Sequence, residues 1–424
     1  MSKTIALNVK KTKRKLKGEP REMTRAEFDA QQVDSRIELI QMLVPIGLMA
    51  FAEELNQEVE RLAGPRYDRS PGEKRVYRHG KNPGTVKFMG QSVPVKVQRV
   101  RVDGKEQPLA VYQQAHRGLV MNEELYRKVL YGLSCRDYEA ASTQIPGAIG
   151  LSKSTVSRQF VEASARQLRE FQERDLSGDD YVAIFLDGKT FADDMMVVAL
   201  GITMVGTKKF LGIVQTATEN ETVLRPFLQS LLDRGLDISC GILAVTDGGK
   251  GLGSALRKVF GRHLHHQRCQ WHKRENVVSY LPKAEQKAWK KRLQAAYQRP
   301  TYDEAKRELA KIHKELKNLN QSAANSLFEG LEETLTLHRL GVFPFLGLSF
   351  KTTNCLESIN AMAEQRCAKV DYWKNSSQKQ RWLVASLTDI EPRLRRVKGW
   401  RHLGKLREAM LHSQEEKLQL ENVG

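Results

Sequence analysis

The chain has 424 residues, 40% of them hydrophobic, and a formal net charge of +19. This length predicts two to four domains with a large buried core, and the apolar fraction excludes a disordered chain. No apolar run reaches the roughly eighteen residues that a membrane-spanning helix needs, and no secretory signal is visible, so we expect neither membrane insertion nor export. Five scattered cysteines without a CxxC pair favour reduced thiols and a cytoplasmic protein.

The strong positive charge predicts a polyanionic partner, of which nucleic acid is the commonest. Each phosphate that a lysine or arginine neutralises releases condensed counterions, so a basic protein can bind nucleic acid without any sequence preference. Charge alone does not distinguish a DNA enzyme from a basic housekeeping protein bound to RNA.

The N-terminal quarter of the chain changes character several times. Residues 1–25 are rich in lysine and arginine and predict a flexible tail, which either lies on DNA phosphates or only aids solubility. Residues 26–118 predict an N-terminal helix and a basic β-rich region. Within them, 38–63 has helical spacing with a kink or break expected at Pro45. Alternating apolar and basic residues over 86–102 predict a half-buried antiparallel strand with a basic exposed face.

Residues 119–175 predict helices separated by a turn at Pro146 and Gly147, which is a helix-turn-helix pattern. Short polar residues open the second helix, where they can cap its N-terminus and present hydroxyls and a positive dipole to phosphate. We expect a DNA-binding region here; the alternative is a helical hairpin that binds nothing. The candidate DNA contacts are Lys153, Ser154, Thr155 and Arg158.

From residue 176 the pattern changes to short buried strands. Apolar runs predict strands at 181–186 and 241–246, which end at Asp187 and Asp247. The other expected elements are a hairpin of 195–205 and 209–216 around Gly206, a helix 222–234 with Pro226 in its first turn, a helix 249–260 stopped by Gly261, and a strand 265–268. This order of strands and helices fits an α/β sheet of ribonuclease-H-like type.

A highly charged helical stretch follows the strands. It predicts a helical insertion over 282–345, in which Thr301 and Glu304 form a capping box. The resulting organisation is a catalytic domain made of 176–281 and 346–385, and a C-terminal helical tail at 386–424.

Asp187 and Asp247 each follow a predicted buried strand. An ionised carboxylate is rarely placed where the core ends without a partner, because its desolvation is costly. Two such aspartates on neighbouring strands repel each other, and a divalent cation between them removes the repulsion; their hard oxygen ligands suit Mg²⁺ or Mn²⁺. The alternative is that each aspartate only caps the following turn or helix, as Asp247 before Gly248 and Gly249 could do.

Glu357 flanks an apolar helical stripe that begins near residue 356. With Asn354 as N-cap, Glu357 occupies the N3 position, where a glutamate completes a capping box. The local pattern alone therefore favours a structural role for this glutamate.

Cys269 and His272 have the spacing of half a metal site. A structural zinc needs four ligands, usually from two such pairs, although His263, His265 and His266 are near in sequence. We favour instead a buried cysteine whose neighbouring histidine hydrogen-bonds the active site.

Residues 181–382 resemble the catalytic domain of the Mutator-type bacterial insertion-sequence transposases, a DDE transposase family. Four motifs in this order are far more specific than any one of them, whereas the N-terminal half is only loosely similar. The matching stretches are Phe-Leu-Asp-Gly at 185–188, Val-Thr-Asp-Gly-Gly-Lys-Gly-Leu at 245–252, Gln-Arg-Cys-Gln-Trp-His-Lys at 267–273 and Thr-Thr-Asn-Cys-Leu-Glu-Ser-Ile-Asn at 352–360.

The resemblance implies a catalytic triad of Asp187, Asp247 and Glu357. For in-line phosphoryl transfer we expect this triad to hold two Mg²⁺ or Mn²⁺ ions per active site, with Asp187 binding both, Asp247 one and Glu357 the other. It implies that Cys269 and His272 are the accessory Cys-x-x-His signature of the family. It also implies binding to the terminal inverted repeats of an insertion sequence and to target DNA, by a homodimer or larger assembly associated with the nucleoid.

We therefore expect metal-dependent strand cleavage followed by strand transfer. Water attacks the element end in line, and the freed 3′-hydroxyl then attacks target DNA. One alternative is a structure-specific DNA nuclease on the same fold, which cuts but never joins. Another is a transposase-derived DNA-binding regulator, although no acid of the triad is missing.

Overall fold

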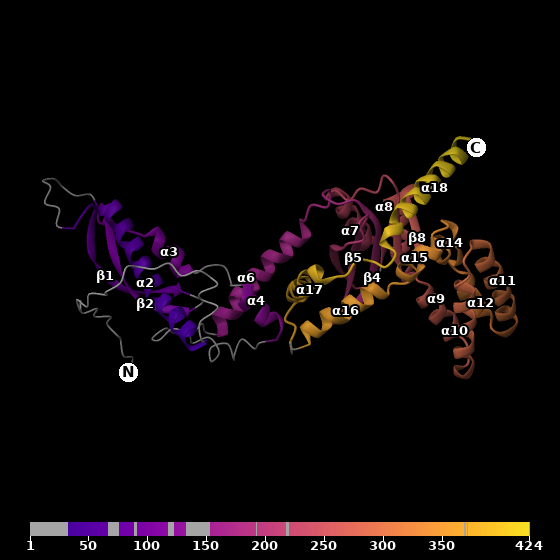
Figure 1. Ribbon diagram of the computed structural model, residues 1–424, viewed down its shortest axis with the longest axis horizontal. Helices are drawn as coiled ribbons and strands as arrows, with labels where there is room; N and C mark the ends of the chain where they lie inside the picture. The colour runs from indigo at the N-terminus through magenta and orange to yellow at the C-terminus, as the bar shows by residue number, and fades with distance from the viewer. Residues whose placement is uncertain are drawn as a thin grey trace. The chain divides into compact units, whose positions relative to one another are not determined.

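The computed structural model describes residues 33–66, 76–88, 91–117, 123–132, 153–191, 193–217, 220–368, 370 and 372–423. The chain divides into two compact units, one of Met1–Val129 with Leu133–Phe160 and the other of Leu130–Gly132 with Val161–Gly424. Both units combine a β-sheet with helices (Figure 1), which confirms the mixed α/β class.

The first unit packs a long helix against a small antiparallel sheet. Its elements are α2 (Val33–Ala63), β1 (Val76–Phe88), β2 (Gln91–Val102), β3 (Lys105–Gln107) and α3 (Ala110–Arg117), with the sheet order β1-β2-β3. The Glu58 carboxylate of α2 accepts the backbone N–H groups of Ala110 at 2.7 Å and Val111 at 3.0 Å. A carboxylate at a helix N-terminus is favourable, so Glu58 fixes α2 to the start of α3.

The expectation of a single strand over 86–102 is wrong, although its alternation of buried and exposed residues is present in β2, and the expected break in α2 is wrong as well. Val93 and Val97 are buried and Lys96 between them is exposed. The pattern spans the facing ends of two strands, β1 and β2, which pair as a hairpin. Helix α2 continues through Pro45, because proline removes one backbone hydrogen bond and the other turns of this 31-residue helix remain.

The predicted helix-turn-helix region falls partly outside the described residues. Helices α4 (Glu123–Leu130) and α6 (Lys153–Gln172) are present, whereas 133–152, which includes the expected turn, is not described. Helix α6 begins where the second helix is expected, and Arg158 on it is exposed. The side chains of Lys153, Ser154 and Thr155 lie outside the described part of the chain.

The second unit is built on a five-stranded mixed sheet. Its strands are β4 (Tyr181–Phe191), β5 (Asp194–Thr203), β6 (Lys208–Thr216), β7 (Ile242–Thr246) and β8 (Leu264–Arg268). The order is β6-β5-β4-β7-β8, antiparallel from β6 to β4 and parallel from β4 to β8. The hairpin around Gly206, the strand before Asp247 and the strand at 265–268 are thus confirmed.

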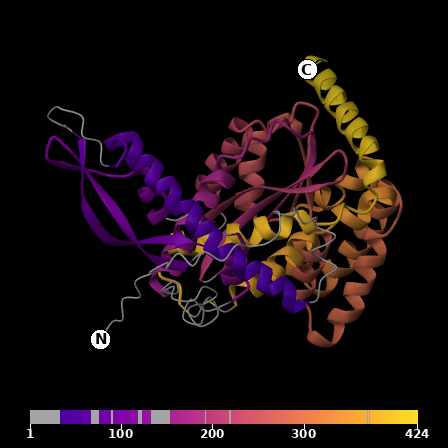
Figure 2. The ribbon, with the colours of Figure 1, turned by 60° about the vertical axis from the view of Figure 1, so that its left-hand side comes forward.

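Helices cover both faces of this sheet (Figure 2). Helices α7 (Glu221–Asp233) and α8 (Lys250–Phe260) pack on one face, and α15 (Phe343–Phe350), α16 (Asn354–Cys367), α17 (Ser376–Ile390) and α18 (Leu403–Val423) pack on the other. Ile184 of β4 faces the first layer and Phe185 the second. Because β4 is buried on both faces, its sequence is an unbroken apolar run.

Two boundaries differ from the expectations. Strand β4 continues to Phe191 because β5 keeps pairing with it as far as Asp194, so Asp187 lies inside a strand and not at its end. Pro226 lies in the second turn of α7, because the helix begins earlier than expected: the Asn220 side chain accepts the N–H of Val223 at 3.0 Å.

Between β8 and α15 the chain is almost entirely helical and has a core of its own (Figure 1). The side chain of Thr301 accepts the N–H of Glu304 at 3.3 Å, which confirms Thr301 as an N-cap. No described helix is long and apolar enough to cross a membrane. The helices of this stretch are α9 (Gln270–Ser279), α10 (Lys283–Tyr297), α11 (Tyr302–Leu319), α12 (Gln321–Phe328), α13 (Leu331–Thr334) and α14 (Thr336–Arg339).

Candidate active site

Asp187 lies within β4, and Asp247 is the first residue after the neighbouring parallel strand β7. Leu186 of β4 is in register with Thr246 of β7, and the next residue of each chain segment is an aspartate. Paired strands are about 4.8 Å apart, so the two aspartates are near neighbours. Phe185 and Val245 both belong to the core beneath α16, and each lies two residues before one of the aspartates. Both aspartates therefore continue the rows that face α16.

The turn after β7 uses Asp247 as a hydrogen-bond acceptor. Its Oδ1 accepts the backbone N–H of Gly249 at 3.0 Å, which is the local role expected as the alternative to catalysis. Gly248 has a φ of +105°, and a Cβ there would collide with the side chain of Arg268, so the position favours glycine. None of the described lysines or arginines forms an ion pair with Asp247.

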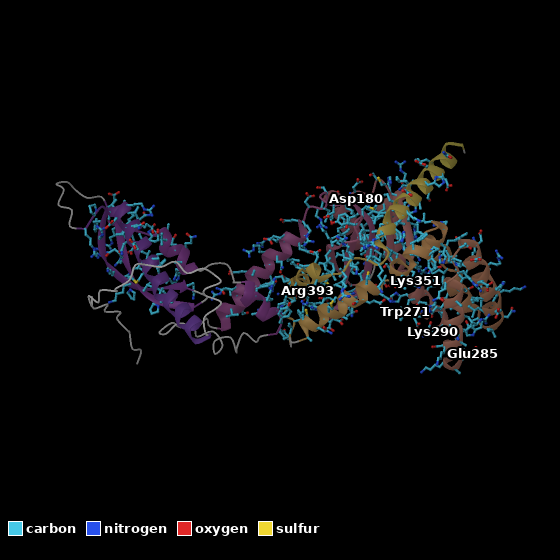
Figure 3. The ribbon with its side chains drawn as sticks, viewed as in Figure 1. Asp180, Trp271, Glu285, Lys290, Lys351 and Arg393 are labelled. Atoms are coloured by element: carbon cyan, nitrogen blue, oxygen red, sulfur yellow. The ribbon has the colours of Figure 1, made fainter. Side chains whose placement is uncertain are left out.

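The Cys-x-x-His segment begins α9 directly after β8. The backbone N–H of Cys269 donates to the carbonyl of Thr246 at 2.7 Å, and that of Gln270 donates to the carbonyl of Lys351 at 2.9 Å (Lys351 is labelled in Figure 3). The start of α9 is thus fixed between the end of β7 and the end of α15. This places the segment beside Asp247, which follows Thr246 in the chain.

Thr353 joins the Cys-x-x-His segment to Glu357. Its side chain is fully buried, and its hydroxyl lies 3.7 Å from Sγ of Cys269, 3.4 Å from Nδ1 of His272 and 3.3 Å from Oε1 of Glu357. Nε2 of His272 lies 3.8 Å from the same Glu357 oxygen. One hydroxyl and one imidazole therefore hold Glu357 beside α9.

The capping-box interpretation of Glu357 is wrong. The N-cap of α16 is Thr353, not Asn354, and no side chain caps this helix. The Thr353 hydroxyl is instead directed to Glu357, Cys269 and His272. Because helical bonding starts one residue earlier than expected, Glu357 falls at the fourth helical position and its carboxylate faces His272.

Cys269, and to a smaller extent the carboxylates, favour a protonated His272. Its hydrogen bond with Cys269 and the negative charges of Asp247 and Asp187 raise the pKa of His272 to about 9, although burial opposes this. Burial disfavours the Cys269 thiolate, but the hydrogen bond and charge of His272 bring the pKa of Cys269 below its usual value. The imidazole is thus a cation at neutral pH with all three predicted acids around it.

The described residues contain no group of three His, Cys, Asp or Glu side chains that could hold one metal ion. The zinc alternative for Cys269 and His272 therefore has no support in this part of the chain. Asp187 and Asp247 lie near each other where the pairing of β4 with β7 ends, and Glu357 lies beside His272. The three carboxylates do not form one group that could hold a metal ion.

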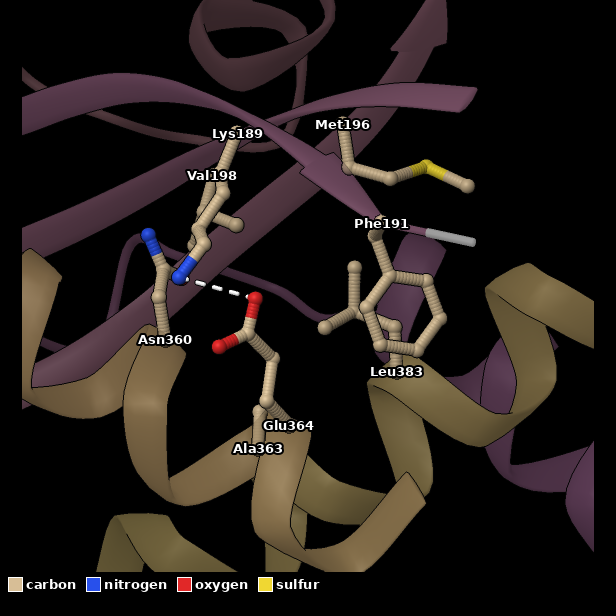
Figure 4. Close-up of a pocket in the computed structure, with 8 residues that line it drawn as sticks. All are labelled: Lys189, Phe191, Met196, Val198, Asn360, Ala363, Glu364 and Leu383. Atoms are coloured by element: carbon tan, nitrogen blue, oxygen red, sulfur yellow. Dashed lines mark ion pairs between the residues drawn. The ribbon is translucent and has the colours of Figure 1, made fainter. Parts of the chain in front are cut away.

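A small pocket lies just beyond Asp187 along β4 (Figure 4). It is enclosed by β4, β5, α16 and α17, and Lys189 in it pairs with Glu364 of α16 at 2.8 Å. Asn360, less than one turn after Glu357, lines the same pocket, and its buried Nδ2 has no hydrogen-bond partner among the described residues. The ion pair ties the helix of Glu357 to the strand of Asp187.

Sequence reasoning missed the residues that hold the motifs together. Beside Thr353, two buried glutamines do this: Oε1 of Gln267 accepts the N–H of Leu337 at 3.0 Å, and Nε2 of Gln270 donates to the carbonyl of Thr334 at 3.0 Å. These bonds fix β8 and α9 to α13 and α14. A polar residue inside a predicted buried strand is the signal that could have identified Gln267, because a buried amide requires partners.

Comparison with known proteins identifies the family of the chain. The model of the family "Transposase, Mutator family" matches residues 21–396. The transposase for insertion sequence element IS6120 of Mycolicibacterium smegmatis is 29% identical over 253 residues, which cover 58% of this chain and 76% of that protein. The transposase for IS256 in transposon Tn4001 of Staphylococcus aureus is 26% identical over 357 residues, covering 79% and 86%. The transposase for IS406 of Burkholderia multivorans is 28% identical over 339 residues, covering 75% and 82%. With most of its length matched, the chain belongs to the Mutator family of transposases.

Proposed function

We propose that the chain cleaves DNA at the ends of an insertion sequence and joins them to target DNA, with Asp187, Asp247 and Glu357 as its catalytic acids. The observation that carries this proposal is the register of β4 and β7: Leu186 pairs with Thr246, and the residue after each is an aspartate, Asp187 within β4 and Asp247 just after β7. Glu357 is linked to the same edge through His272 and Thr353.

The topology supports a ribonuclease-H-like catalytic domain. Three antiparallel strands are followed by two parallel ones, with a helix before each of the latter. Residues 176–281 and 346–385 would form this domain, and 282–345 would be its insertion. Residues 119–175 would bind the terminal inverted repeats, with Lys153, Ser154, Thr155 and Arg158 on the first turns of α6 as contacts.

The chemistry of the three carboxylates fits divalent cations, for which we propose two Mg²⁺ or Mn²⁺ ions. Carboxylate oxygens are the hard ligands that these ions prefer. In a chain with a net charge of +19, neither Asp247 nor Glu357 is paired with a described lysine or arginine, so both remain available to a metal. Bound ions would act as Lewis acids that activate the attacking oxygen and stabilise the leaving one.

The protein residues around the acids orient them. Thr353 donates to Glu357 and restricts its side chain, and the cationic His272 compensates the charge of the acids while no other cation is bound. The turn bond from Gly249 fixes the carboxylate of Asp247. One phosphodiester is exchanged for another in strand transfer, so the reaction needs no energy cofactor.

The test is to neutralise each acid while keeping its shape. Asp187→Asn, Asp247→Asn and Glu357→Gln should each abolish cleavage of a labelled element end in Mg²⁺, because a neutral amide cannot replace a metal-binding carboxylate. Binding of the same DNA in a gel-shift titration should persist. The matched control is Asp233→Asn, which changes an exposed aspartate at the end of α7.

Three outcomes separate the candidate functions. A variant that still cleaves at a near-normal rate removes that residue from the triad. Cleavage by the wild type without joining of a pre-nicked element end to a target plasmid would identify a nuclease. Binding without any metal-dependent cleavage would identify a DNA-binding regulator.

A further inference from the structure

The segment 393–405, which follows α17 and includes the first three residues of α18, is strongly cationic. The geometry points to a second DNA-binding surface, which contacts the phosphates of duplex DNA. The segment contains no acidic residue, and the family model ends at residue 396, within it. Its cations are Arg393 (labelled in Figure 3), Arg395, Arg396, Lys398, Arg401 and Lys405.

Most of these charges are exposed and unneutralised. Arg393 pairs with Asp389. The other five are all exposed, and none forms an ion pair with a carboxylate in the described part of the chain; they are Arg395, Arg396, Lys398, Arg401 and Lys405. Surface cations are usually interspersed with acids, so five unpaired ones in eleven residues, from 395 to 405, create a local positive potential.

The backbone of the segment is fixed, so these charges are presented in a defined arrangement. Val397 is buried and its N–H donates to the carbonyl of Gly206 at 3.0 Å. The hydroxyl of Ser349 donates to the carbonyl of Lys398 at 2.9 Å. Gly399 has a φ of +81°, and a Cβ there would lie 2.5 Å from the carbonyl oxygen of Phe345. A solubilising tail would not need such close packing.

Aromatic rings hold the cations in place. The guanidinium carbons of Arg396 and Arg401 lie 4.8 Å and 5.4 Å from the ring centre of Trp400. Nζ of Lys405 lies 4.2 Å from the ring centre of Phe345. Two arginines held at one ring repel each other, and a cation over an aromatic face keeps its N–H groups free for an anion. A phosphate between them would relieve the repulsion.

The partner that fits this surface is duplex DNA. This choice of partner rests on the proposed function of the chain. Its phosphates supply about one negative charge per 1.7 Å of helix axis, so a row of fixed cations can contact several at once. Contacts of this kind position the DNA and do not read its sequence. The surface would therefore contribute equally to binding of the element end and of unrelated DNA.

The test replaces four of these cations in the full-length chain, as Arg395→Gln, Arg396→Gln, Arg401→Gln and Lys405→Gln together. The control carries Lys283→Gln, Lys287→Gln, Lys291→Gln and Lys314→Gln, which remove the same charge from exposed lysines of α10 and α11 that also lack ion pairs among the described residues. Affinity for a fluorescent duplex is measured by anisotropy at several salt concentrations without divalent metal, so cleavage plays no part.

The surface variant should bind at least about tenfold more weakly than the control near physiological salt, for specific and random duplexes alike. The slope of log affinity against log salt should fall by about 0.9 for each phosphate that the variant no longer neutralises. Equal affinities and slopes for the two variants would overturn the inference, and so would a surface variant that loses binding only to RNA of equal length. Because the readout is binding, a failure here is distinct from a failure of the cleavage test.

Discussion

Replacing Thr353 by valine should separate the positioning of Glu357 from the stability of the fold. Valine nearly matches the shape of threonine in this fully buried site, but it lacks the hydroxyl that lies 3.3 Å from Oε1 of Glu357 and 3.4 Å from Nδ1 of His272. These distances are long for hydrogen bonds of a hydroxyl. The substitution should therefore lower the free energy of unfolding by only about 1 kcal/mol, or the Tm by about 2–4 °C.

The effect on the reaction should be much larger than the effect on stability. Without the hydroxyl, Glu357 keeps only its interaction with His272, and a displacement of about 1 Å at a reacting centre can cost about 100-fold in rate. Single-turnover cleavage of an element end, measured beside thermal unfolding, gives both quantities. Thr353→Ser keeps the hydroxyl and should recover most of the rate. If the valine variant cleaves as fast as the wild type while its Tm falls as expected, Thr353 does not position Glu357.

Two further predictions concern stability. Gly248→Ala should destabilise the fold by about 2 kcal/mol or more, because a side chain at this left-handed φ is strained and would collide with Arg268. Gly404→Ala is the control: Gly404 lies in α18 with open space around it, so denaturant titration should find this variant no less stable than the wild type. Burial lowers the pKa of His338 to about 4, so the folded state binds a proton less readily than the unfolded chain, whose value is 6.5. The stability that neutral His338 contributes above pH 6.5 should be lost as the pH falls toward 4, and His338→Gln should flatten the dependence of Tm on pH in that window. An unchanged slope would contradict this.

The sheet of the second unit follows from patterns that the sequence displays directly. A strand buried on both faces is visible in the sequence as an unbroken apolar run. A glycine between two such runs predicts a turn, and Gly206 has the positive φ that such a turn requires. These local signals correctly place Asp247 at the end of a buried strand. They do not reveal that β4 continues past Asp187, because that extension comes from pairing with β5, which a single strand's sequence does not encode.

The environment of Glu357 could not be derived in the same way, because it depends on contacts that are distant in sequence. Local pattern favours a capping role, yet the N-cap hydroxyl of α16 is directed to a cysteine 84 residues earlier. Two other bonds between distant segments lie in the same region: the N–H of Gln270 donates to the carbonyl of Lys351, and the side chain of Gln267 accepts the N–H of Leu337.

The helical stretch of α10 to α14 does more than link β8 to α15, because it is also bonded to residues beside the proposed active site. It has a buried hydrophobic core of its own, and its last helices are hydrogen-bonded to β8 through the Gln267 amide and to the start of α9 through the Gln270 amide. The position of Thr353 relative to His272 is therefore set by the folding of α10 to α14. Helices α14 and α15 are in contact, so this stretch connects the hydrogen bonds of Gln267 and Gln270 to the start of α16.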